Sequence, residues 1–278
     1  MPAEFYNRRI LVMGLGHFGG GVAVARWLAL QGARVTVTDA APEAKLTESL
    51  AQLEGLPIRY RLGGHDPADL EGCELLVISP AVPKDRSEFV RTARERGIPI
   101  SSEMNLFVER CRARRIVGIT GSAGKSTTTA MLGAIAARAF PGGSRPGAWV
   151  GGNIGRSLLP DLEQIRHEDV VILELSSFQL EDLAALRWSP HIALITNIQP
   201  NHLDRHGTLE AYADAKLNIV RYQRPGDVVL VHERDEALAD RVRAVGAASR
   251  LERYRFDAAF ADVIRVPGPH NRDNAAGA

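Results

Sequence analysis

The chain has 278 residues, of which 45% are hydrophobic, and a formal net charge of +1 from 34 basic and 33 acidic residues. This length suggests about two domains with real cores, and the balanced charge argues against a nucleic-acid-binding or membrane-surface protein. Two cysteines form no disulfide framework, no apolar run approaches the ~18 residues of a membrane span, and the N-terminus lacks a signal-peptide pattern, so we expect a cytoplasmic enzyme.

A strand, a glycine turn and a helix open the chain. We predict a buried strand at residues 9–13, the turn Gly-Leu-Gly-His-Phe-Gly at 14–19, a helix over about 20–31 and a strand at 34–38 that ends at Asp39. This βαβ pattern with an acidic residue after its second strand is typical of dinucleotide sites. Such a turn also binds other nucleotides, and a tight turn with close helix packing needs the same glycines.

Strands and helices alternate over the next 80 residues. We predict strands at 75–78 and 98–100 and helices at 88–96 and 103–111. This alternation indicates a parallel, doubly wound sheet. The basic run at 110–115 is interpreted as a solvated linker, and it divides the chain into predicted domains at 1–112 and 113–278.

A phosphate-binding loop is indicated at residues 121–127, Gly-Ser-Ala-Gly-Lys-Ser-Thr, between an apolar strand and an Ala-rich helix at 128–140. Small residues let backbone N–H groups point at phosphate oxygens, and the helix N-terminus adds the positive end of a dipole. Lys125 adds charge, and the Ser126 hydroxyl can hold Mg²⁺. The usual pattern has glycine at position 119, which is Ile119 here, so the loop is a variant.

Polar side chains mark the ends of two later strands. The strand at 170–175 carries Glu174, where proteins with a phosphate loop hold Mg²⁺, and a buried carboxylate needs a cation or hydrogen-bond donors. The strand at 191–198 leads into residues 201–206, which contain two histidines and an aspartate. Ligands bind at such strand ends, although a lone loop histidine is usually a surface residue. The spacing fits no zinc pattern.

The remaining segments are predicted from composition. Residues 141–151 are rich in glycine and proline and indicate a loop. Residues 208–222 form a predicted helix with a threonine N-cap, which carries Lys216. A strand is expected at 227–231, and short strands or loop at 253–266.

Together these motifs resemble the Mur ligases, the ATP-dependent amide-forming enzymes of peptidoglycan precursor synthesis, over essentially the whole chain. The motifs that carry the resemblance are the early glycine loop, Ser79-Pro80, residues 120–127, Gly152-Asn153-Ile154-Gly155, residues 174–181, residues 201–205, Ala215-Lys216-Leu217, and His270-Asn271 with Asn274. The run 174–181 favours the member that adds D-glutamate. The resemblance implies an α/β fold, in which a Rossmann-like N-terminal domain precedes a P-loop-type central domain with three layers and a mostly parallel sheet.

The resemblance also implies site residues. ATP would contact Gly121, Ser122, Ala123, Gly124, Lys125, Ser126 and Thr127, with Asn271 and Asn274 toward the adenine. One Mg²⁺ would be held by Ser126 and Glu174, and a second by His202 and by Lys216 as a carbamate. The catalytic residues would be Lys125, His202 and Lys216. The UDP-substrate would contact His17, Phe18, Asp39 and Ser79, with Asn153, Ser176 and Gln179 toward its muramoyl part.

The implied reaction joins UDP-N-acetylmuramoyl-L-alanine to D-glutamate. The terminal carboxylate attacks the γ-phosphate of ATP to give an acyl phosphate, and the amine of D-glutamate then displaces phosphate. We expect a monomer with no nucleic-acid or membrane partner. The chain has Ala123 where the family usually has Asn, which removes a side-chain amide near the phosphates. It has Asn201 where Asp is common, which removes a negative charge near the metals.

Family members carry a third domain that binds the incoming amino acid, whereas this chain ends just after Asn274 in an expected helix. We therefore expect the chain to be a truncated ligase, an ordered fragment of a longer protein or a degenerate copy. Whether the chain catalyses the reaction alone is left open. Another ligase of the superfamily, adding a different amino acid or extending a folate, is a second interpretation. An inactive nucleotide-binding protein is a third. A further interpretation, an NAD-dependent oxidoreductase, depends only on the glycine turn at residues 14–19.

Overall fold

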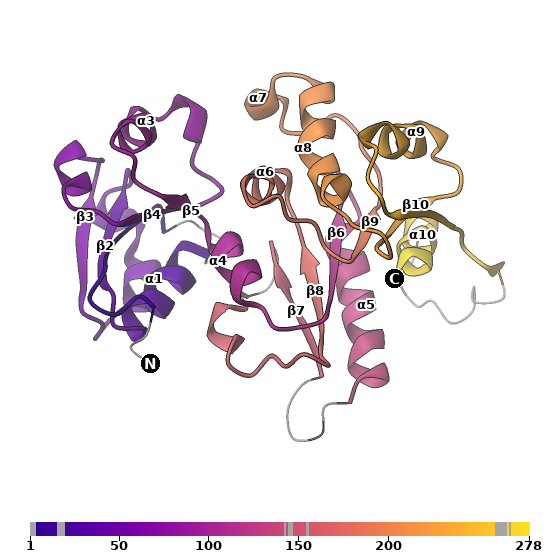
Figure 1. Ribbon diagram of the computed structural model, residues 1–278, viewed down its shortest axis with the longest axis horizontal. Coiled ribbons are helices and arrows are strands. Elements are labelled where there is room, and N and C mark those ends of the chain that lie inside the picture. Colours follow the sequence, from indigo (N-terminus) through magenta and orange to yellow (C-terminus); the bar gives the residue numbers. More distant parts are fainter. Residues whose placement is uncertain are drawn as a thin grey trace. The chain divides into compact units, whose positions relative to one another are not determined.

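The computed structural model describes residues 4–15, 20–141, 143, 147–153, 156–258, 266 and 268–278. The chain divides into two compact units (Figure 1), of which the first comprises Met1–Arg110 with Leu159–Leu162 and the second comprises Cys111–Leu158 with Glu163–Ala278. Because compact units need not coincide with domains, the ranges 1–112 and 113–278 stay predictions.

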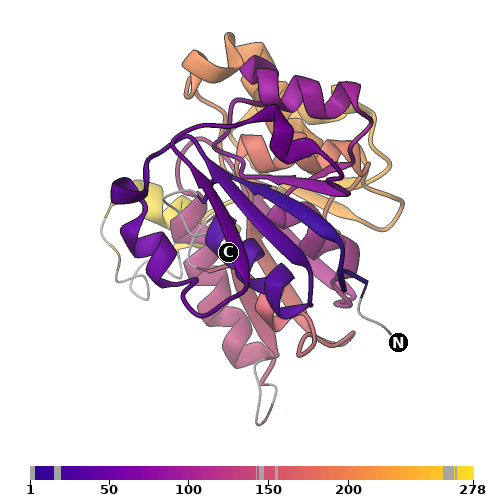
Figure 2. The same ribbon diagram turned by 90° about the vertical axis from the view of Figure 1, so that its left-hand side faces the viewer.

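The first unit is built on a parallel sheet with the strand order β3-β2-β1-β4-β5 among the described residues. Its strands are β1 (Arg9–Met13), β2 (Arg34–Asp39), β3 (Ile58–Leu62), β4 (Leu75–Ile78) and β5 (Ile100–Ser101). Its helices are α1 (Gly20–Leu30), α2 (Thr47–Ala51), α3 (Glu88–Glu95) and α4 (Glu103–Arg110), with short 3₁₀ helices η1 (Glu43–Lys45), η2 (Pro67–Leu70), η3 (Lys84–Arg86) and η4 (Leu159–Asp161). Figure 2 views the molecule from the side of this sheet.

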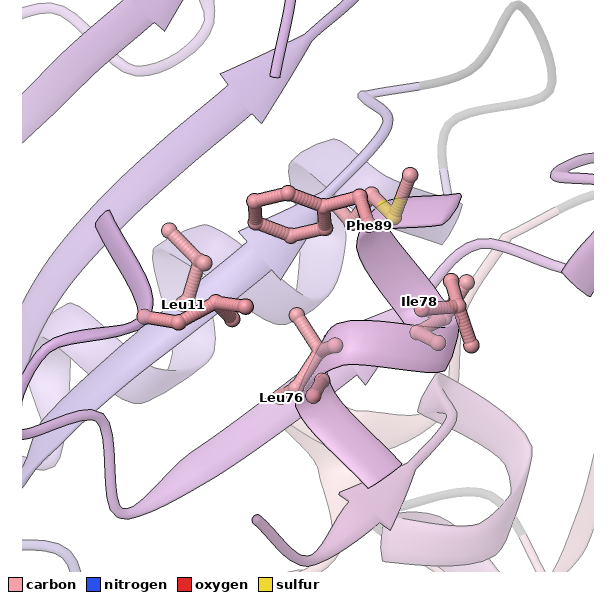
Figure 3. Packing of buried hydrophobic residues seen from close by; sticks show 8 residues of the cluster. Leu11, Leu76, Ile78 and Phe89 are labelled. Carbon is pink, nitrogen blue, oxygen red and sulfur yellow. The ribbon is translucent and has the colours of Figure 1, made fainter. Parts of the chain in front are cut away.

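Apolar side chains hold α3 on one face of this sheet. Phe89 of α3 packs with Leu11 of β1 and with Leu76 and Ile78 of β4 (Figure 3). All four side chains are nearly inaccessible to solvent, and burial of each contributes about 2 kcal/mol. This cluster fixes the spacing of β1 and β4, whose carboxyl ends flank the glycine turn.

The second unit has a parallel sheet with the order β11-β10-β9-β6-β8-β7 in the described part of the chain. Its strands are β6 (Arg115–Thr120), β7 (Ala148–Gly152), β8 (Val170–Glu174), β9 (Ile192–Ile195), β10 (Val228–His232) and β11 (Arg250–Tyr254). Its helices are α5 (Lys125–Ala139), α6 (Ser177–Ala185), α7 (Leu203–His206), α8 (Leu209–Arg221), α9 (Glu236–Val245) and α10 (Pro269–Gly277).

Helices lie on both sides of this second sheet. Leu132 and Ala136 of α5 and Ala276 of α10 pack on the β6 face that carries Val117 and Ile119. Helices α6 and α8 pack against each other (Figure 1), and α8 contacts β6. The predicted α/β class with parallel sheets is confirmed. No helix within the described ranges is long and apolar enough to cross a membrane.

The prediction of a loop over residues 141–151 is wrong in its last part, because β7 forms there. Trp149 is buried, and its Nε1 donates to Asp169 Oδ2 at 3.0 Å. The side chain of Val150 packs closely on α5 at Gly133, where an added Cβ would lie only 2.7 Å from Val150 Cγ2. Pairing with β8 and this packing outweigh the local glycine and proline content.

Candidate active site

The predicted phosphate loop joins β6 to α5. Gly121 has φ 154° and Gly124 has φ 83°, a backbone region that favours glycine. A Cβ on Gly121 would lie 1.9 Å from Thr196 Oγ1, and one on Gly124 would lie 2.4 Å from Asn274 Oδ1. Both positions therefore exclude a larger side chain, and the loop leads directly into the N-terminus of α5, where backbone N–H groups bind anions.

Side chains that follow β9 hold the loop in place. Asn197 Oδ1 accepts from the Ala123 N–H at 3.1 Å, and Asn197 Nδ2 donates to the Ala123 carbonyl at 3.0 Å. Thr196 Oγ1 donates to the same carbonyl at 2.6 Å. Ser122 Oγ donates to the Gln199 carbonyl and accepts from its N–H, each at 2.8 Å. Sequence reasoning missed this set, although its place at a strand end is the usual signal of a ligand site.

Two lysines lie at the end of β6. Lys125 Nζ donates to the carbonyls of Gly121 at 2.9 Å and Ser122 at 3.2 Å. Lys216 of α8 is 1% exposed, and its Nζ donates to Thr120 Oγ1 at 3.3 Å. The helix lysine is therefore a buried group beside the phosphate loop, whereas a lysine on a helix is ordinarily solvated.

Burial lowers the pKa of both lysines. The pKa of Lys216 falls to about 7, chiefly through loss of solvation and also through the charge of Lys125, while Glu174 opposes the shift. Loss of solvation also lowers the pKa of Lys125, and Glu174 again opposes it. Lys216 Nζ lies 4.8 Å from the ring centroid of Tyr212, a contact that favours the ammonium form only weakly. Near pH 7 a large share of Lys216 is therefore a neutral amine.

Glu174 ends β8 as a buried carboxylate, 1% exposed. Its Oε1 accepts from Asn153 Nδ2 at 3.0 Å, and its backbone carbonyl accepts from the Asn153 N–H at 2.8 Å. Its Oε2 has no hydrogen-bond partner among the described residues. A buried carboxylate oxygen without a donor is costly, and it is the type of ligand that Mg²⁺ prefers.

These oxygen donors fit Mg²⁺ better than other metals. Ser126 lies in the first turn of α5 and is exposed, so its hydroxyl is available together with Glu174. Over the described residues, no group of three His, Cys, Asp or Glu side chains could hold a metal ion. Mg²⁺ usually takes one or two protein oxygens and completes its shell with phosphate and water, which agrees with this small donor set.

The two histidines of the 201–206 segment have different surroundings. His202 is exposed, has φ 50° and lies 5.4 Å from the Phe178 ring. His206 stacks on Phe178 at 5.1 Å, its Nε2 lies 2.9 Å from Ser177 Oγ, and its Nδ1 lies 3.3 Å from Glu181 Oε1. Burial lowers the pKa of His206, and the His202 and Lys216 charges add to this. His206 is therefore a packed residue, and His202 makes no hydrogen bond to Lys216 within the described structure.

Helix α10 brings two predicted adenine residues to the loop. Asn271 and Asn274 are buried, and Asn274 Nδ2 donates to Asn271 Oδ1 at 3.1 Å. The side-chain Oδ1 of Asn274 lies against Gly124. Their contact with adenine stays a prediction.

Ser176 and Gln179 form the capping box of α6. Ser176 Oγ accepts from the Gln179 N–H at 3.2 Å, and Gln179 Oε1 accepts from the Ser176 N–H at 3.0 Å. Both side chains thus satisfy backbone groups at the helix start, and their contact with a substrate stays a prediction.

In the first unit, Asp39 and Ser79 surround the glycine turn. Both Asp39 oxygens accept backbone N–H groups, from Leu15 at 2.9 Å and from Ala41 at 2.8 Å. A Cβ on Gly14 would lie 3.2 Å from Ser79 Cβ. The carboxylate therefore shapes the turn, at the carboxyl ends of β1, β2 and β4, where ligands bind in this kind of fold. The other two predicted residues, His17 and Phe18, lie outside the described residues.

The fold is that of an α/β protein, and the loop after β6 has the backbone geometry that a phosphate-binding loop needs. Two family descriptions match the chain: Mur ligase middle domain over residues 119–265, and Mur ligase MurD-like, N-terminal domain over residues 8–102. The chain belongs to the Mur ligase family, as the sequence motifs indicate.

Similar proteins include several named UDP-N-acetylmuramoylalanine–D-glutamate ligase. The one from Roseiflexus sp. (strain RS-1) is 49% identical over 229 residues, which cover 82% of this chain and 48% of the relative. The one from Symbiobacterium thermophilum is 38% identical over 296 residues, which cover 98% of this chain and 62% of the relative. The chain thus spans about half to three fifths of the length of these relatives.

A solved structure shares the fold. It is the UDP-N-acetylmuramate:L-alanyl-gamma-D-glutamyl-meso-diaminopimelate ligase from Neisseria meningitides, with a TM-score of 0.65 and 21% identity, and the match covers 98% of this chain and 91% of that chain.

Proposed function

We propose that the chain supplies the nucleotide- and UDP-substrate-binding parts of an ATP-dependent ligase that adds D-glutamate to UDP-N-acetylmuramoyl-L-alanine in peptidoglycan precursor synthesis. The names of its relatives support this reaction. The observation that carries the proposal is the arrangement at the end of β6, beside a glycine loop at a helix N-terminus. There Lys125 and the buried Lys216 both lie close enough to Glu174 for its negative charge to oppose the lowering of their pKa values.

The loop residues meet the main physical need of the first step, which is to bring a carboxylate and a triphosphate together. The Lys125 ammonium is held by the Gly121 and Ser122 carbonyls. Phosphate oxygens are stronger acceptors for a charged donor, so Lys125 would move onto the phosphates when ATP binds. The first N–H groups of α5 would hold the same phosphates, and Asn271 and Asn274 would lie toward the adenine.

Ser126 and Glu174 would hold Mg²⁺, and His202 with carbamylated Lys216 would hold a second ion. Bound Mg²⁺ neutralises charge that develops on the transferred phosphoryl group. The neutral Lys216 amine is suited to carbamylation: its nitrogen forms a bond to the carbon of CO₂, one C=O π bond opens onto oxygen, and the nitrogen proton leaves to solvent. The product replaces a cation by anionic oxygens, which a hard ion binds well.

The UDP-substrate would bind in the first unit at the turn that Asp39 shapes, with Ser79, His17 and Phe18. Asn153, Ser176 and Gln179 would lie toward the muramoyl part. The strand ends at which Asp39 and Ser79 lie support this placement.

The test is ADP release from ATP by the 278-residue chain with each substrate added or left out. We expect release to require UDP-N-acetylmuramoyl-L-alanine, because the carboxylate of this substrate accepts the phosphoryl group. Lys125→Ala should lower the rate by about 10² or more, whereas Arg91→Ala, a change of an exposed arginine on α3, should leave it unchanged. Release with a different amino acid or a folate would favour another ligase of the superfamily. ATP binding without release would favour a nucleotide-binding protein, and unchanged turnover in Lys125→Ala would contradict the loop assignment.

A further inference from the structure

One half of the first unit's sheet carries arginines on a single face. Parallel pairing sets Arg9 of β1 beside Arg34 of β2, and Thr36 of β2 beside Arg59 of β3. Alternate residues of a strand share a face, so Arg61 lies on this face as well. Leu76 and Ile78 continue the same face on β4, where α3 covers them, but all four arginines are exposed. Figure 2 looks onto this side of the sheet.

This composition is unusual for a parallel sheet, whose two faces are normally apolar and covered by helices. The guanidinium groups of Arg9, Arg34 and Arg59 have no ion-pair or hydrogen-bond partner among the described residues. Arg61 is paired, with its Nε 3.1 Å from Asp69 Oδ1. Three unpaired guanidinium groups on neighbouring strands repel one another, so this face is suited to an anion.

A pocket of about 890 Å³ lies on this face. Its charged lining consists of the four arginines with Asp69 and Glu71, so positive charge exceeds negative. Neighbouring strands are ~4.8 Å apart, a spacing that lets two guanidinium groups reach two linked phosphates. Arginine binds phosphate through paired N–H donors of fixed geometry.

We propose that this pocket binds an anion with two or more neighbouring phosphate groups. The site is separate from the one proposed for the UDP-substrate, because Arg9 and Arg34 are the first residues of their strands, whereas Asp39 ends β2. The ligand's phosphates belong either to an inorganic polyphosphate or to a nucleotide.

The test is a calorimetric titration of inorganic pyrophosphate into the Lys125→Ala chain, in which the phosphate loop is weakened. Arg34→Gln and Arg59→Gln should each weaken binding by about tenfold or more, since each removes a charged hydrogen-bond donor. Arg91→Gln is the matched control, because Arg91 is an exposed arginine of the same unit and already pairs with Glu88. Absence of binding, or equal affinity in the pocket and control variants, would overturn the proposal.

Cys73 also lines the pocket and gives a second, local readout. Cys111→Ser leaves Cys73 as the only thiol of the chain. Burial raises the pKa of the Cys73 thiol, so its reaction with an anionic thiol reagent is followed at alkaline pH. Saturating pyrophosphate should slow this reaction several-fold, and an unchanged rate would contradict binding in the pocket.

The same variants distinguish the source of the phosphates. ADP binding that weakens in Arg34→Gln would support a nucleotide, and binding of pyrophosphate alone would support an inorganic polyphosphate. Binding of anionic phospholipid vesicles or of duplex DNA without pyrophosphate binding would overturn the proposal in favour of a macromolecular surface.

Discussion

The side-chain amide of Asn197 holds the backbone of Ala123 at both of its hydrogen-bonding groups, the N–H at 3.1 Å and the carbonyl at 3.0 Å. These bonds involve no atom of the Ala123 side chain. The position of the phosphate loop is therefore set from the end of β9, and the segment that carries His202 continues from the same strand end. An ordered loop lowers the entropy cost of binding a nucleotide.

We predict that Asn197→Ala weakens ATP binding by about tenfold, because two hydrogen bonds that order the loop are lost. Asn197→Asp keeps the acceptor for the Ala123 N–H, but it sets a carboxylate oxygen against the Ala123 carbonyl and adds a negative charge beside the loop, so it should weaken ATP binding more than Asn197→Ala. The measurement is ATP affinity by titration. Ser87→Ala is the control, since it removes the N-cap of α3 in the other unit and should lower stability alone. Equal ATP affinity in Asn197→Ala and wild type would exclude the positioning role.

Burial of Lys216 predicts that stability depends on pH. Its pKa is about 7 in the folded chain and 10.5 in the unfolded chain. Between these values the unfolded chain binds the extra proton, so the free energy of unfolding should rise with pH by about 1.4 kcal/mol per unit. Below pH 7 Lys216 is protonated in both the folded and the unfolded chain, so the full cost of burying its charge lowers the free energy of unfolding.

Lys216→Met removes this contribution and keeps the side-chain volume. Urea unfolding in CO₂-free buffer should therefore show that the variant gains most over wild type near pH 6 and that the gain shrinks toward pH 10. Lys45→Met, at an exposed lysine of the first unit, should show no such trend. A gain for Lys216→Met that does not change with pH would contradict the assigned burial of charge.

Glu174→Gln tests the link between the carboxylate and the two lysines. The negative charge of Glu174 raises the pKa of Lys216, so its removal should move the onset of the pH-dependent stability below pH 7. It should also reduce the effect of Mg²⁺ on ATP affinity, because the unpartnered Oε2 is the proposed ligand. Glu233→Gln, at an exposed position of the second unit, serves as the control. If Mg²⁺ strengthens ATP binding equally in wild type and Glu174→Gln, the carboxylate is not its ligand.

The two glycine loops and their flanking strands could be predicted because local sequence specifies them. Apolar runs predict β1 and β6, and glycines follow each strand at once. Other elements depend on distant contacts. Sequence patterns did not predict β3, in which Arg59 and Arg61 interrupt the apolar run, and they misassigned β7, which pairing and the Trp149 contact stabilise.

In the candidate site, too, local sequence specifies some residues and distant contacts specify others. Lys125 and Glu174 stand out in the sequence, because a glycine loop or an apolar strand surrounds them. The bond from Asn197 to Ala123 spans 74 positions, and the one from Ser122 to Tyr212 spans 90. No local sequence pattern predicts contacts between residues so far apart in the chain. The burial of Lys216 likewise depends on the fold, and the sequence did not predict it. Family resemblance alone singled out this lysine.

Carbamylation of Lys216 gives a spectroscopic prediction. In ¹³C-labelled bicarbonate, wild type should show a carbamate carbon signal that weakens as the pH falls below about 7, because only the neutral amine reacts. Lys216→Ala should lack this signal, and Lys45→Ala should retain it. Short carboxylic acids should partly restore ADP release in Lys216→Ala by supplying the missing oxygens. A spectrum without a carbamate signal at pH 8, where the amine is mostly neutral, would exclude the modification in the isolated chain.

The α6 capping box separates a structural role from a substrate role. Ser176→Ala should lower the free energy of unfolding by about 1 kcal/mol through loss of the cap. Gln179→Glu keeps an acceptor for the Ser176 N–H and should cost less. If Ser176 also contacts the muramoyl substrate, Ser176→Ala should weaken binding of UDP-N-acetylmuramoyl-L-alanine by about tenfold. Ser87→Ala removes a cap of the same kind from α3 and should lower stability alone. Equal substrate affinity in Ser176→Ala and Ser87→Ala would leave Ser176 as a helix cap.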